Sequence, residues 1–499
     1  MNTLGNLGKG ALASSGSDVV SRMAWNRRSF LLRSATVAGG CACCGGGLSV
    51  LGGRTPLKGS PLVSPGCRRS PVKVARVYLG KPDAHWPTPK LDLGAERGTY
   101  EAEFVKEPGA FSDVAFTVDE LVSDPKQVEG LKDRLSAADG ILLIHLSMGM
   151  RETIEAILAC GRPTALFAAP YSGHEWSQFG AIRQKPVGAH LECFLTSDRS
   201  QLAAAVRPFR AIHHLREAKI LNINARARQD ETIPAWQAKF GTEFKTVDRE
   251  RVLAAYEAVS VRDAEAEARR WIADAAKVVE PSRDEIVRSC RLALAFETLL
   301  AEEDATVITA DCYGTMYGKL PAFPCVGFVR LNDMGLGGIC ESDLKSAMTY
   351  ILLQGLSGRP GFISDPTVDE SARSIILAHC LGTRKMDGPE GRAAKYRLRS
   401  IMERQEGCVP QVFMRRGQKV TQALLATPDS ILYFTGDIIG VPDSDRGCRT
   451  QIQVRVDGDI GKVWQHWAHG LHRVTCYGDL ADDLQRFCRY KDLTWVNEA

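Results

Sequence analysis

Most of this 499-residue sequence lacks any surplus of positive charge. The formal net charge of the chain is +4, but the first seventy residues hold nine Lys or Arg against the single acid Asp18, a net of +8. The remaining residues therefore carry a net charge of −4. A mildly acidic body argues against nucleic acid or an anionic membrane as the main partner.

The sequence also lacks the cysteine spacings that mark a disulfide framework or a zinc finger. Its 15 cysteines are scattered along the chain, and no pair in the body has the short spacing of a zinc site. We therefore expect most of them to be small, buried, apolar residues of a protein that folds in a reducing compartment.

Motifs of three common enzyme classes are missing. Residues 314–319 resemble a phosphate-binding loop, but the glycines are one residue too close and Leu320 replaces the Ser or Thr that would bind magnesium. The glycine-rich run at residues 335–338 lacks the third glycine of a dinucleotide fingerprint, because Cys340 occupies that position. No Gly-x-Ser-x-Gly motif is present. These absences argue against phosphotransfer, nicotinamide redox chemistry and serine hydrolysis.

The basic N-terminus resembles a twin-arginine export signal. Arg27 and Arg28 are followed by an acid-free, weakly hydrophobic stretch at residues 34–53, which is too rich in glycine for a stable membrane span. We expect export through this pathway after folding, with residues 60–70 as a linker; an unused signal would leave the protein cytoplasmic. Cys41 follows Ala-Gly-Gly, which weakly resembles a lipoprotein cleavage site, so a lipid anchor there is an alternative.

Strands and helices alternate along much of the body, which predicts parallel, doubly wound sheets. Residues 72–79 and 140–145 are apolar runs typical of buried strands, residues 193–196 open a second series, and residues 248–303 are helical almost throughout. From residue 411, short β-type runs alternate with Gly, Asp and Pro turns. We therefore expect a signal and linker, two doubly wound α/β domains and a β-rich, barrel-like C-terminal domain, over residues 1–70, 71–190, 191–365 and 366–499.

Two acidic residues stand where an ion or a substrate could bind. Glu341 falls where a loop enters the helix predicted at residues 344–356, and Asp365 ends the next short strand, with Pro366 as its terminator. Ligands bind at the carboxyl ends of strands in open α/β sheets, so Glu341 and Asp365 are candidates to converge on one ion or one substrate. The alternative is that they are ordinary acids of a helix start and a turn.

Three of the ten histidines cluster near the C-terminus, at His466, His469 and His472. They would share a face in a helix, but they lie among β-type runs, where alternation places His466 and His472 together and His469 opposite. A neutral imidazole with two carboxylates suits a divalent cation such as Mn²⁺. Each histidine taken alone could instead be an ordinary hydrogen-bonded side chain.

Two segments resemble the family of L-fucose and L-arabinose isomerases. The first contains Cys340-Glu341-Ser-Asp343, Ala347-Met-Thr349, Leu356-Ser-Gly358 and Phe362-Ile-Ser-Asp365, and the second contains His466-Trp467, His472 and Tyr477-Gly478. The resemblance covers about residues 305–380 and 445–495, and the first half of the chain matches only in architecture.

The resemblance implies an enzyme that interconverts an aldose and a ketose through an ene-diol. Glu341 and Asp365 correspond to the family's paired metal-binding acids, which also move the proton, and His472 corresponds to the third metal ligand. It further implies a divalent metal, Mn²⁺ in the first instance, a fucose- or arabinose-like sugar as substrate, and a homo-oligomer.

Departures from the family pattern leave other functions open. The chain is shorter than L-fucose isomerase after Asp365, and an export signal is unusual for a sugar isomerase. The alternatives are an exported sugar-binding protein without turnover, another metal-dependent enzyme on this scaffold, and an exported redox protein, although no cofactor motif supports the last. The candidates for sugar specificity are Asp311, Asp343, His174 and Trp86; His379 has no assigned role.

Overall fold

The computed structural model of the protein describes residues 70–173, 175–225 and 231–499. The expected export signal, all but the last residue of the linker, and the candidate lipid-attachment residue Cys41 lie outside this part of the chain. Within it, no helix combines the length and the apolar character that a bilayer crossing would require.

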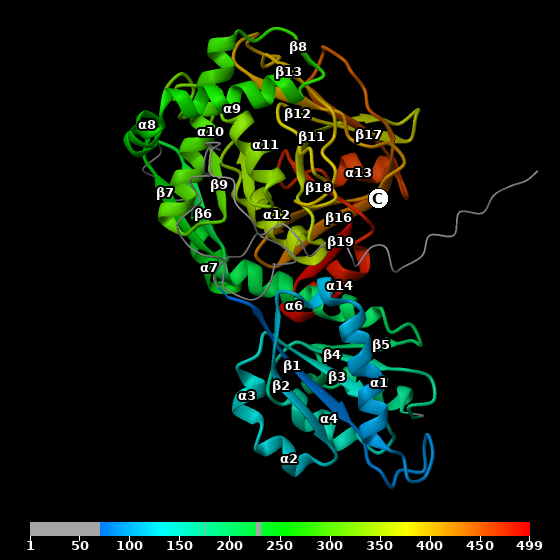
Figure 1. Cartoon of the computed structure of the whole chain (residues 1–499). Helices are drawn as coiled ribbons and strands as arrows, with labels where there is room; N and C mark the ends of the chain where they lie inside the picture. Colours follow the sequence, from blue (N-terminus) through cyan, green and yellow to red (C-terminus); the bar gives the residue numbers. More distant parts are fainter. Residues whose placement is uncertain (1–69, 174, 226–230) are drawn as a thin grey trace, which may run out of the picture. The chain divides into compact units, whose positions relative to one another are not determined.

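A parallel sheet of five strands forms the first domain, in the order β2-β1-β3-β4-β5 (Figure 1). This is one of the two common doubly wound orders. The strands are β1 (Val72–Leu79), β2 (Val114–Val122), β3 (Gly140–His145), β4 (Thr164–Ala168) and β5 (Leu191–Leu195). All six residues of β3 are buried, as expected of a strand covered by helices on both faces.

Helices cover both faces of this sheet. One face packs against α1 (Leu93–Lys106) and α6 (Gln201–Glu217), through an aromatic core that includes Phe167 and Phe209. The opposite face packs against α2 (Pro125–Glu129), α3 (Lys132–Ser136), α4 (Arg151–Leu158) and α5 (Trp176–Arg183). Two short 3₁₀ turns, Pro108–Phe111 and Pro186–Gly188, lie in the connections.

The strand β5 corrects one sequence prediction. The apolar run at residues 193–196 was expected to open the second domain, but β5 is the edge strand of the first sheet and pairs with β4. The physical reason is packing: Phe194 is buried in the same core as Phe167 and Phe209. Local sequence shows that a strand forms, but it does not show which neighbour it pairs with.

The second sheet is also parallel, with four strands in the order β10-β9-β6-β7. They are β6 (Lys219–Ile223), β7 (Glu243–Val247), β9 (Val307–Ala310) and β10 (Gly337–Cys340). The helices of this region are α7 (Ile233–Phe240), α8 (Arg249–Ala258), α9 (Val261–Asp274), α10 (Arg283–Glu303), α11 (Cys325–Asp333) and α12 (Leu344–Ser357). Ser282 and Glu285 form a capping box that starts α10.

The stretch at residues 248–303 is helical as predicted, apart from two breaks, a short one at residues 259–260 and a longer one at residues 275–282. The two-residue strand β8 (Lys277–Val278) separates α9 from α10 and pairs with β13 (Tyr396–Arg399), which in turn pairs with β14 (Val409–Val412). A strand of two residues has no periodicity, so the sequence pattern could not reveal it.

A closed barrel of six antiparallel strands forms the C-terminal domain. Its strands follow the order β15-β18-β11-β12-β17-β16, and the pairing of β16 with β15 closes it. They are β11 (Phe362–Asp369), β12 (Ser374–His379), β15 (Lys419–Thr427), β16 (Ser430–Gly440), β17 (Thr450–Val456) and β18 (Arg473–Tyr477). The chain also forms α13 (Ile460–His466), α14 (Ala481–Lys491) and β19 (Thr494–Asn497), which pairs with β16. Two parallel α/β sheets and a barrel confirm the predicted fold class.

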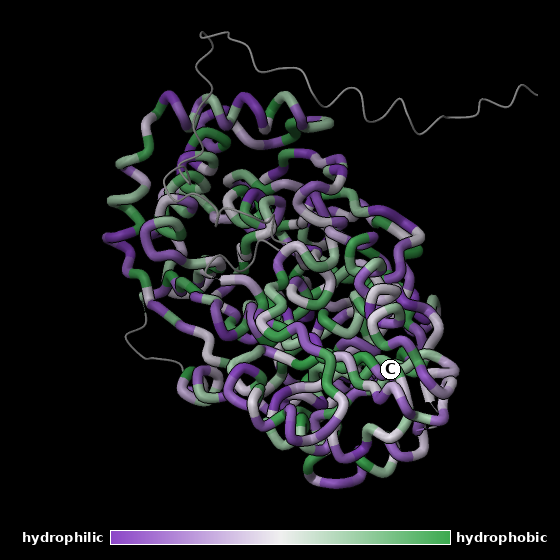
Figure 2. The backbone as a smooth tube through the Cα atoms, turned by 60° about the horizontal axis from the view of Figure 1, so that its bottom comes forward, coloured by the Kyte–Doolittle hydropathy of each residue, from purple (hydrophilic) through white to green (hydrophobic). Residues whose placement is uncertain are grey.

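Hydropathy follows this architecture. Figure 2 shows hydrophilic segments along many of the outer turns of the backbone tube. Apolar side chains of β12 and β17, such as Ile375, Leu377, Ile452 and Val454, are fully buried. The barrel is therefore a packed structure whose ends, rather than its interior, offer positions for functional side chains.

The strand β11 corrects a second prediction. It belongs to the barrel rather than to the second parallel sheet, and it continues through Pro366 to Asp369 instead of ending at Asp365. Its pairing with β18 involves only Phe362 to Ser364, so from Asp365 onward that edge has no ladder partner among the described residues. A proline is tolerated there because its missing N–H is not needed for pairing.

Candidate metal centre

Glu341 occupies a strained turn at the carboxyl end of β10. Its φ angle is 61° and that of Ser342 is 54°, so two successive non-glycine residues adopt the left-handed conformation. The Ser342 hydroxyl donates to Asn222 Oδ1 at 2.8 Å, and its backbone N–H donates to the Ala310 carbonyl. Strain of this kind persists only where the surrounding structure enforces it, and it concentrates at functional sites. The turn thus fixes the direction of the Glu341 carboxylate.

Asp365 and His472 meet through the register of the barrel strands. Ser364 in β11 pairs with Arg473 in β18, so the next position along each antiparallel strand places Asp365 opposite His472. On the other side of β11, Asp365 pairs with Ala378, which brings His379 to the same end of the barrel. Strand register therefore assembles side chains that the sequence keeps far apart.

The three residues predicted as metal ligands lie together. His472 Nε2 is 3.2 Å from Asp365 Oδ1 and 3.7 Å from Glu341 Oε2. His472 and Asp365 come from the barrel, whereas Glu341 comes from the second parallel sheet. The structure brings them within reach of one small ion; their role as ligands stays a prediction.

Asp343 orients the imidazole of His472. His472 Nδ1 lies 2.9 Å from Asp343 Oδ2, and the same carboxylate caps α12 by accepting from the N–H and hydroxyl of Ser346. With its proton on Nδ1, the neutral ring directs the Nε2 lone pair toward Asp365 and Glu341. A carboxylate behind a histidine is the usual arrangement around a metal-binding imidazole.

Charge in the cluster is unbalanced without a cation. Burial opposes protonation of His472, but the carboxylates of Asp343 and Asp365 raise its pKa to about 10. Burial raises the pKa of Glu341, and although His472 lowers it, the nearby Asp365 and Asp343 raise it further. Burial also disfavours the charged form of Asp365, yet His472 holds the pKa of Asp365 below its usual value. A divalent cation would take the place of the proton on His472 and relieve the repulsion among the acids.

His379 is a member of the cluster that sequence reasoning left without a role. Its ring centroid lies 5.3 Å from that of His472, and Asp365, His379 and His472 each offer a ligand atom within 4.8 Å of the others. Its Nδ1 accepts the N–H of Cys380 at 2.9 Å, so the neutral ring carries its proton on Nε2. Burial lowers the pKa of His379 to about 4, which keeps the ring neutral. His379 therefore directs a hydrogen-bond donor into the cluster.

The chemistry of these donors fits a divalent cation. Asp365 Oδ1, His472 Nε2 and His379 Nε2 are buried, and none has a hydrogen-bond partner in the described part of the chain. Buried polar atoms without partners are costly and call for a ligand. Carboxylate oxygens with one imidazole nitrogen are suitable ligands for several divalent ions, Mn²⁺ among them.

The other sequence candidates separate into two groups. Asp343 is within the cluster, and Asp311, at the carboxyl end of β9, is close enough to raise the pKa of Glu341. Trp86 lies on the loop after β1, at the carboxyl edge of the first sheet, and His174 falls outside the described residues. Only the first two are placed by the structure beside the predicted ligands.

His466, His469 and His472 do not lie on one strand. His466 is the last residue of the helix α13, where its Nδ1 lies 3.0 Å from the Glu498 carbonyl oxygen, and His469 is exposed on the loop that follows. The expected alternation was therefore wrong, because a short helix ends between β17 and β18. His472, which directly precedes β18, is the one of the three that reaches the cluster.

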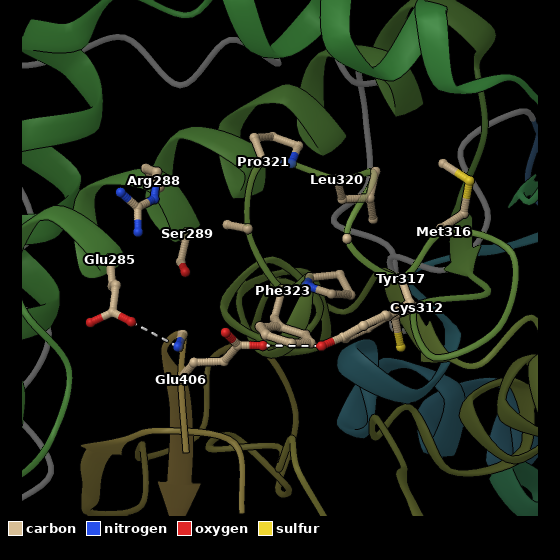
Figure 3. A pocket seen from close by; sticks show the side chains of 14 residues that line it. Glu285, Arg288, Ser289, Cys312, Met316, Tyr317, Leu320, Pro321, Phe323 and Glu406 are labelled. Carbon is tan, nitrogen blue, oxygen red and sulfur yellow. Dashed lines mark hydrogen bonds between the residues drawn. The ribbon is translucent and has the colours of Figure 1, made fainter. Parts of the chain in front are cut away.

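A cavity of about 300 Å³ lies beside the loop that follows β9. Figure 3 shows Glu285, Arg288 and Ser289 of α10 on one side of it, with Cys312, Met316 and Tyr317 on the other. Ser289 Oγ is buried and has no hydrogen-bond partner among the described residues. Cys312 Sγ is 3.5 Å from the Sγ of Cys340, the residue before Glu341. One wall of the cavity therefore lies next to the residue that precedes a predicted metal ligand.

Comparison with known proteins places the chain near sugar isomerases. No family model matches it. It is 23% identical over 270 residues to a protein of Alkalicoccus urumqiensis and 23% identical over 222 residues to one of Clostridium sp. strain MSTE9, covering 52% and 41% of this chain. Both relatives are named sulfoquinovose isomerase, and the chain spans about half of their length, 58% and 46%. The chain is thus similar, over about half its length, to proteins named as isomerases of a sugar.

Proposed function

We propose that this protein is a metal-dependent aldose–ketose isomerase. The observation that carries the proposal is the convergence of Glu341, Asp365 and His472 from two separate sheets, with buried donor atoms that lack hydrogen-bond partners among the described residues. The similarity to two sulfoquinovose isomerases supports the same class of reaction. Glu341, Asp365 and His472 would hold the cation, Mn²⁺ in the first instance.

The cation, when bound, supplies Lewis acidity toward the two sugar oxygens between which a proton is exchanged. We assign the transfer of the carbon proton to Glu341, whose pKa is raised by burial and by the neighbouring acids. Asp365, whose pKa is held low, stays ionised and keeps its charge toward the cation. His472, fixed by Asp343, moves no proton in this scheme.

The atoms balance through an ene-diol. Glu341 removes the proton on C2 of the aldose, the freed electron pair forms the C1–C2 double bond, and O1 takes up a proton. Glu341 then returns its proton to C1 as O2 loses one, which leaves the ketose. The Nε2–H of His379 is placed to donate a hydrogen bond to one of the sugar oxygens during this exchange.

Isotope exchange tests the proposal. The metal-loaded protein is incubated with a panel of aldoses in deuterated water, and deuterium is expected in the sugar as the ketose accumulates. Glu341→Gln and Asp365→Asn should each abolish both signals, and their combined loss should not be additive, because the two act as a unit. Asp369→Asn, in the same strand but half-buried and hydrogen-bonded to the Ser371 hydroxyl, is the control that keeps activity. Tight binding of a sugar without exchange would favour a binding protein instead.

The sugar itself is the finer part of the proposal. The resemblance to fucose and arabinose isomerases favours a deoxy sugar or a pentose, whereas the relatives' name indicates a sulfonated sugar. Arg288 lines the cavity that Cys312 also lines, and the Cys312 thiol lies 3.5 Å from that of Cys340; a guanidinium there is suited to pair with a sulfonate. If the substrate is sulfonated, Arg288→Gln should raise KM for that sugar at least about tenfold and leave any unsulfonated substrate unaffected.

We also propose export through the twin-arginine pathway and assembly into a homo-oligomer. Arg27→Lys together with Arg28→Lys should retain the precursor in the cytoplasm as a folded protein, as measured by cell fractionation. Unchanged export of the double variant would refute the twin-arginine assignment, and a mature N-terminus at Cys41 would support the lipid anchor. Light scattering of the purified protein measures the oligomeric state.

A further inference from the structure

A second group of metal-type donors lies where none was expected from the sequence. Cys380 Sγ is 3.8 Å from Cys448 Sγ, Cys448 Sγ is 3.3 Å from Glu403 Oε1, and Cys380 Sγ is 3.9 Å from Glu403 Oε2. All three can offer one ligand atom within 4.8 Å of the others. We call these residues the thiol triangle. None of them is among the ligands assigned to the candidate metal centre.

The edges of the thiol triangle match the coordination sphere of a small tetrahedral cation. A tetrahedral ion with Zn–S bonds of about 2.3 Å needs its two sulfurs about 3.8 Å apart, and a carboxylate oxygen about 3.5 Å from each of them. The two sulfurs lie 3.8 Å apart, which matches the sulfur–sulfur edge, and the Glu403 carboxylate faces both of them, with Oε1 at 3.3 Å from Cys448 Sγ and Oε2 at 3.9 Å from Cys380 Sγ. Three protein ligands leave the fourth tetrahedral position to water.

The charge around Glu403 also suits a cation. Its carboxylate accepts from the Cys448 thiol and the Tyr313 hydroxyl, and no Lys or Arg among the described residues forms an ion pair with it. A carboxylate beside two ionisable thiols is a negative site once the thiols lose their protons. We propose that Cys380, Cys448 and Glu403 bind a thiophilic divalent cation, Zn²⁺ in the first instance.

The bound ion would join three segments around the candidate metal centre. Cys380 directly follows β12, and its backbone N–H donates to His379 Nδ1. Cys448 lies two residues before the start of β17. Glu403 accepts a hydrogen bond from the hydroxyl of Tyr313, on the loop after β9. A cation there would fix the strand end that sets the His379 ring. The assignment of this second site rests on the thiol triangle alone, so it does not require the proposed isomerase reaction to be correct.

Cobalt substitution tests the proposal directly. The full-length protein is reduced, stripped with a chelator and titrated with Co²⁺, and absorption is recorded for thiolate-to-cobalt charge transfer and for the visible bands of a tetrahedral ion. The expected result is a charge-transfer band that Zn²⁺ displaces. Cys380→Ser and Cys448→Ser should each reduce the intensity of that band by about half or more. Each should also weaken Zn²⁺ binding at least about tenfold, because even the loss of a group that hydrogen-bonds to a metal ligand weakens binding by that factor.

Matched variants separate this site from its neighbours. Cys488→Ser, a buried thiol in α14, should leave the band unchanged, and so should Cys312→Ser, from the other thiol pair. Glu403→Gln removes the exposed ligand, so it tests the site even if Cys380→Ser, at a buried position, does not fold. A band that survives in the Cys380 and Cys448 variants, no band in the wild type, or loss of the band only in Cys340→Ser would overturn the proposal.

Discussion

His472 has two functional nitrogens with different tasks. Nδ1 is engaged by Asp343, and Nε2 is the atom that faces the two candidate acids. Removing the ring should therefore remove a metal ligand without removing the carboxylates. We expect His472→Ala to lose bound Mn²⁺, measured by elemental analysis after gel filtration. His469→Ala, three residues earlier on an exposed loop, is the control and should retain the metal. Full retention in the His472 variant would show that the third ligand is wrongly assigned.

Asp343 combines a structural and an orienting role, and one substitution separates them. Asparagine is as good a helix cap as aspartate, so Asp343→Asn should preserve the start of α12. It removes the charge behind His472, which should weaken Mn²⁺ binding by about 10- to 100-fold.

The measurement is a Mn²⁺ titration followed by electron paramagnetic resonance of the free ion, with circular dichroism as the check on folding. Asp459→Asn makes the same change at the cap of α13 and should leave the affinity unchanged. An unaltered affinity in the Asp343 variant would mean that His472 needs no orienting partner.

At the scale of elements, α12 links the candidate metal centre to the rest of the chain, because it begins at Asp343 and packs against α6. Gly355 makes this close approach possible: a Cβ there would lie 2.6 Å from the Ala211 Cα of α6. We expect Gly355→Ala to destabilise the protein by roughly 1–3 kcal/mol, because the helices would have to separate.

Chemical denaturation measures this effect, and a second glycine supplies the control. Gly98 lies in α1 with no atom near its would-be Cβ, so Gly98→Ala should stabilise the protein by about 0.5–1 kcal/mol through helix propensity alone. Equal effects of the two substitutions would show that the contact between α12 and α6 is not tight.

Much of the fold could be predicted from local pattern, and the errors share one cause. The continuous apolar run of β3 and the helical run at residues 344–356 are local signals, and they indicated a strand and the helix α12 correctly. The assignment of β5 to the second domain and of β11 to a parallel sheet was wrong, since pairing partners depend on tertiary packing.

The candidate site, too, could be predicted from local sequence only in part. Glu341 could be placed at the entry to a helix from sequence alone, but the meeting of Asp365 with His472 is a result of barrel register. His379 received no role because nothing local distinguishes a buried donor from an ordinary core histidine. The thiol triangle has no spacing motif, since Cys380, Glu403 and Cys448 come together through strand pairing and a surface loop.

For the whole molecule, the buried His214 predicts a loss of stability in acid. His214 in α6 is fully buried, and burial lowers its pKa to about 3. The unfolded chain, with an ordinary histidine pKa near 6.5, binds the proton more readily, so folding stability falls as the pH drops from about 6.5 toward 3. The contribution of this one residue reaches the order of 4 kcal/mol at the acid end of that range.

Thermal unfolding between pH 7 and 4 measures this dependence. His214→Gln, which does not titrate, should show a smaller drop in melting temperature over that range than the wild type. Asp139 acts at lower pH. Burial opposes its ionisation, but His213 and Arg216 lower its pKa to about 2 in the folded protein. Its contribution to stability is therefore lost only when the pH falls below about 4. Parallel curves for the wild type and the His214 variant would contradict the prediction.

The candidate metal centre draws its side chains from two separate sheets, one an open parallel sheet and one a closed barrel. An unfinished chain holds these groups apart, so it has no means of discriminating one metal from another. Selection of the ion must then coincide with completion of the tertiary structure, and the metals present in the compartment of folding decide the outcome. If a protein folds before it crosses a membrane, it would bind its metal in the compartment where it folds and would be exported with that metal already bound.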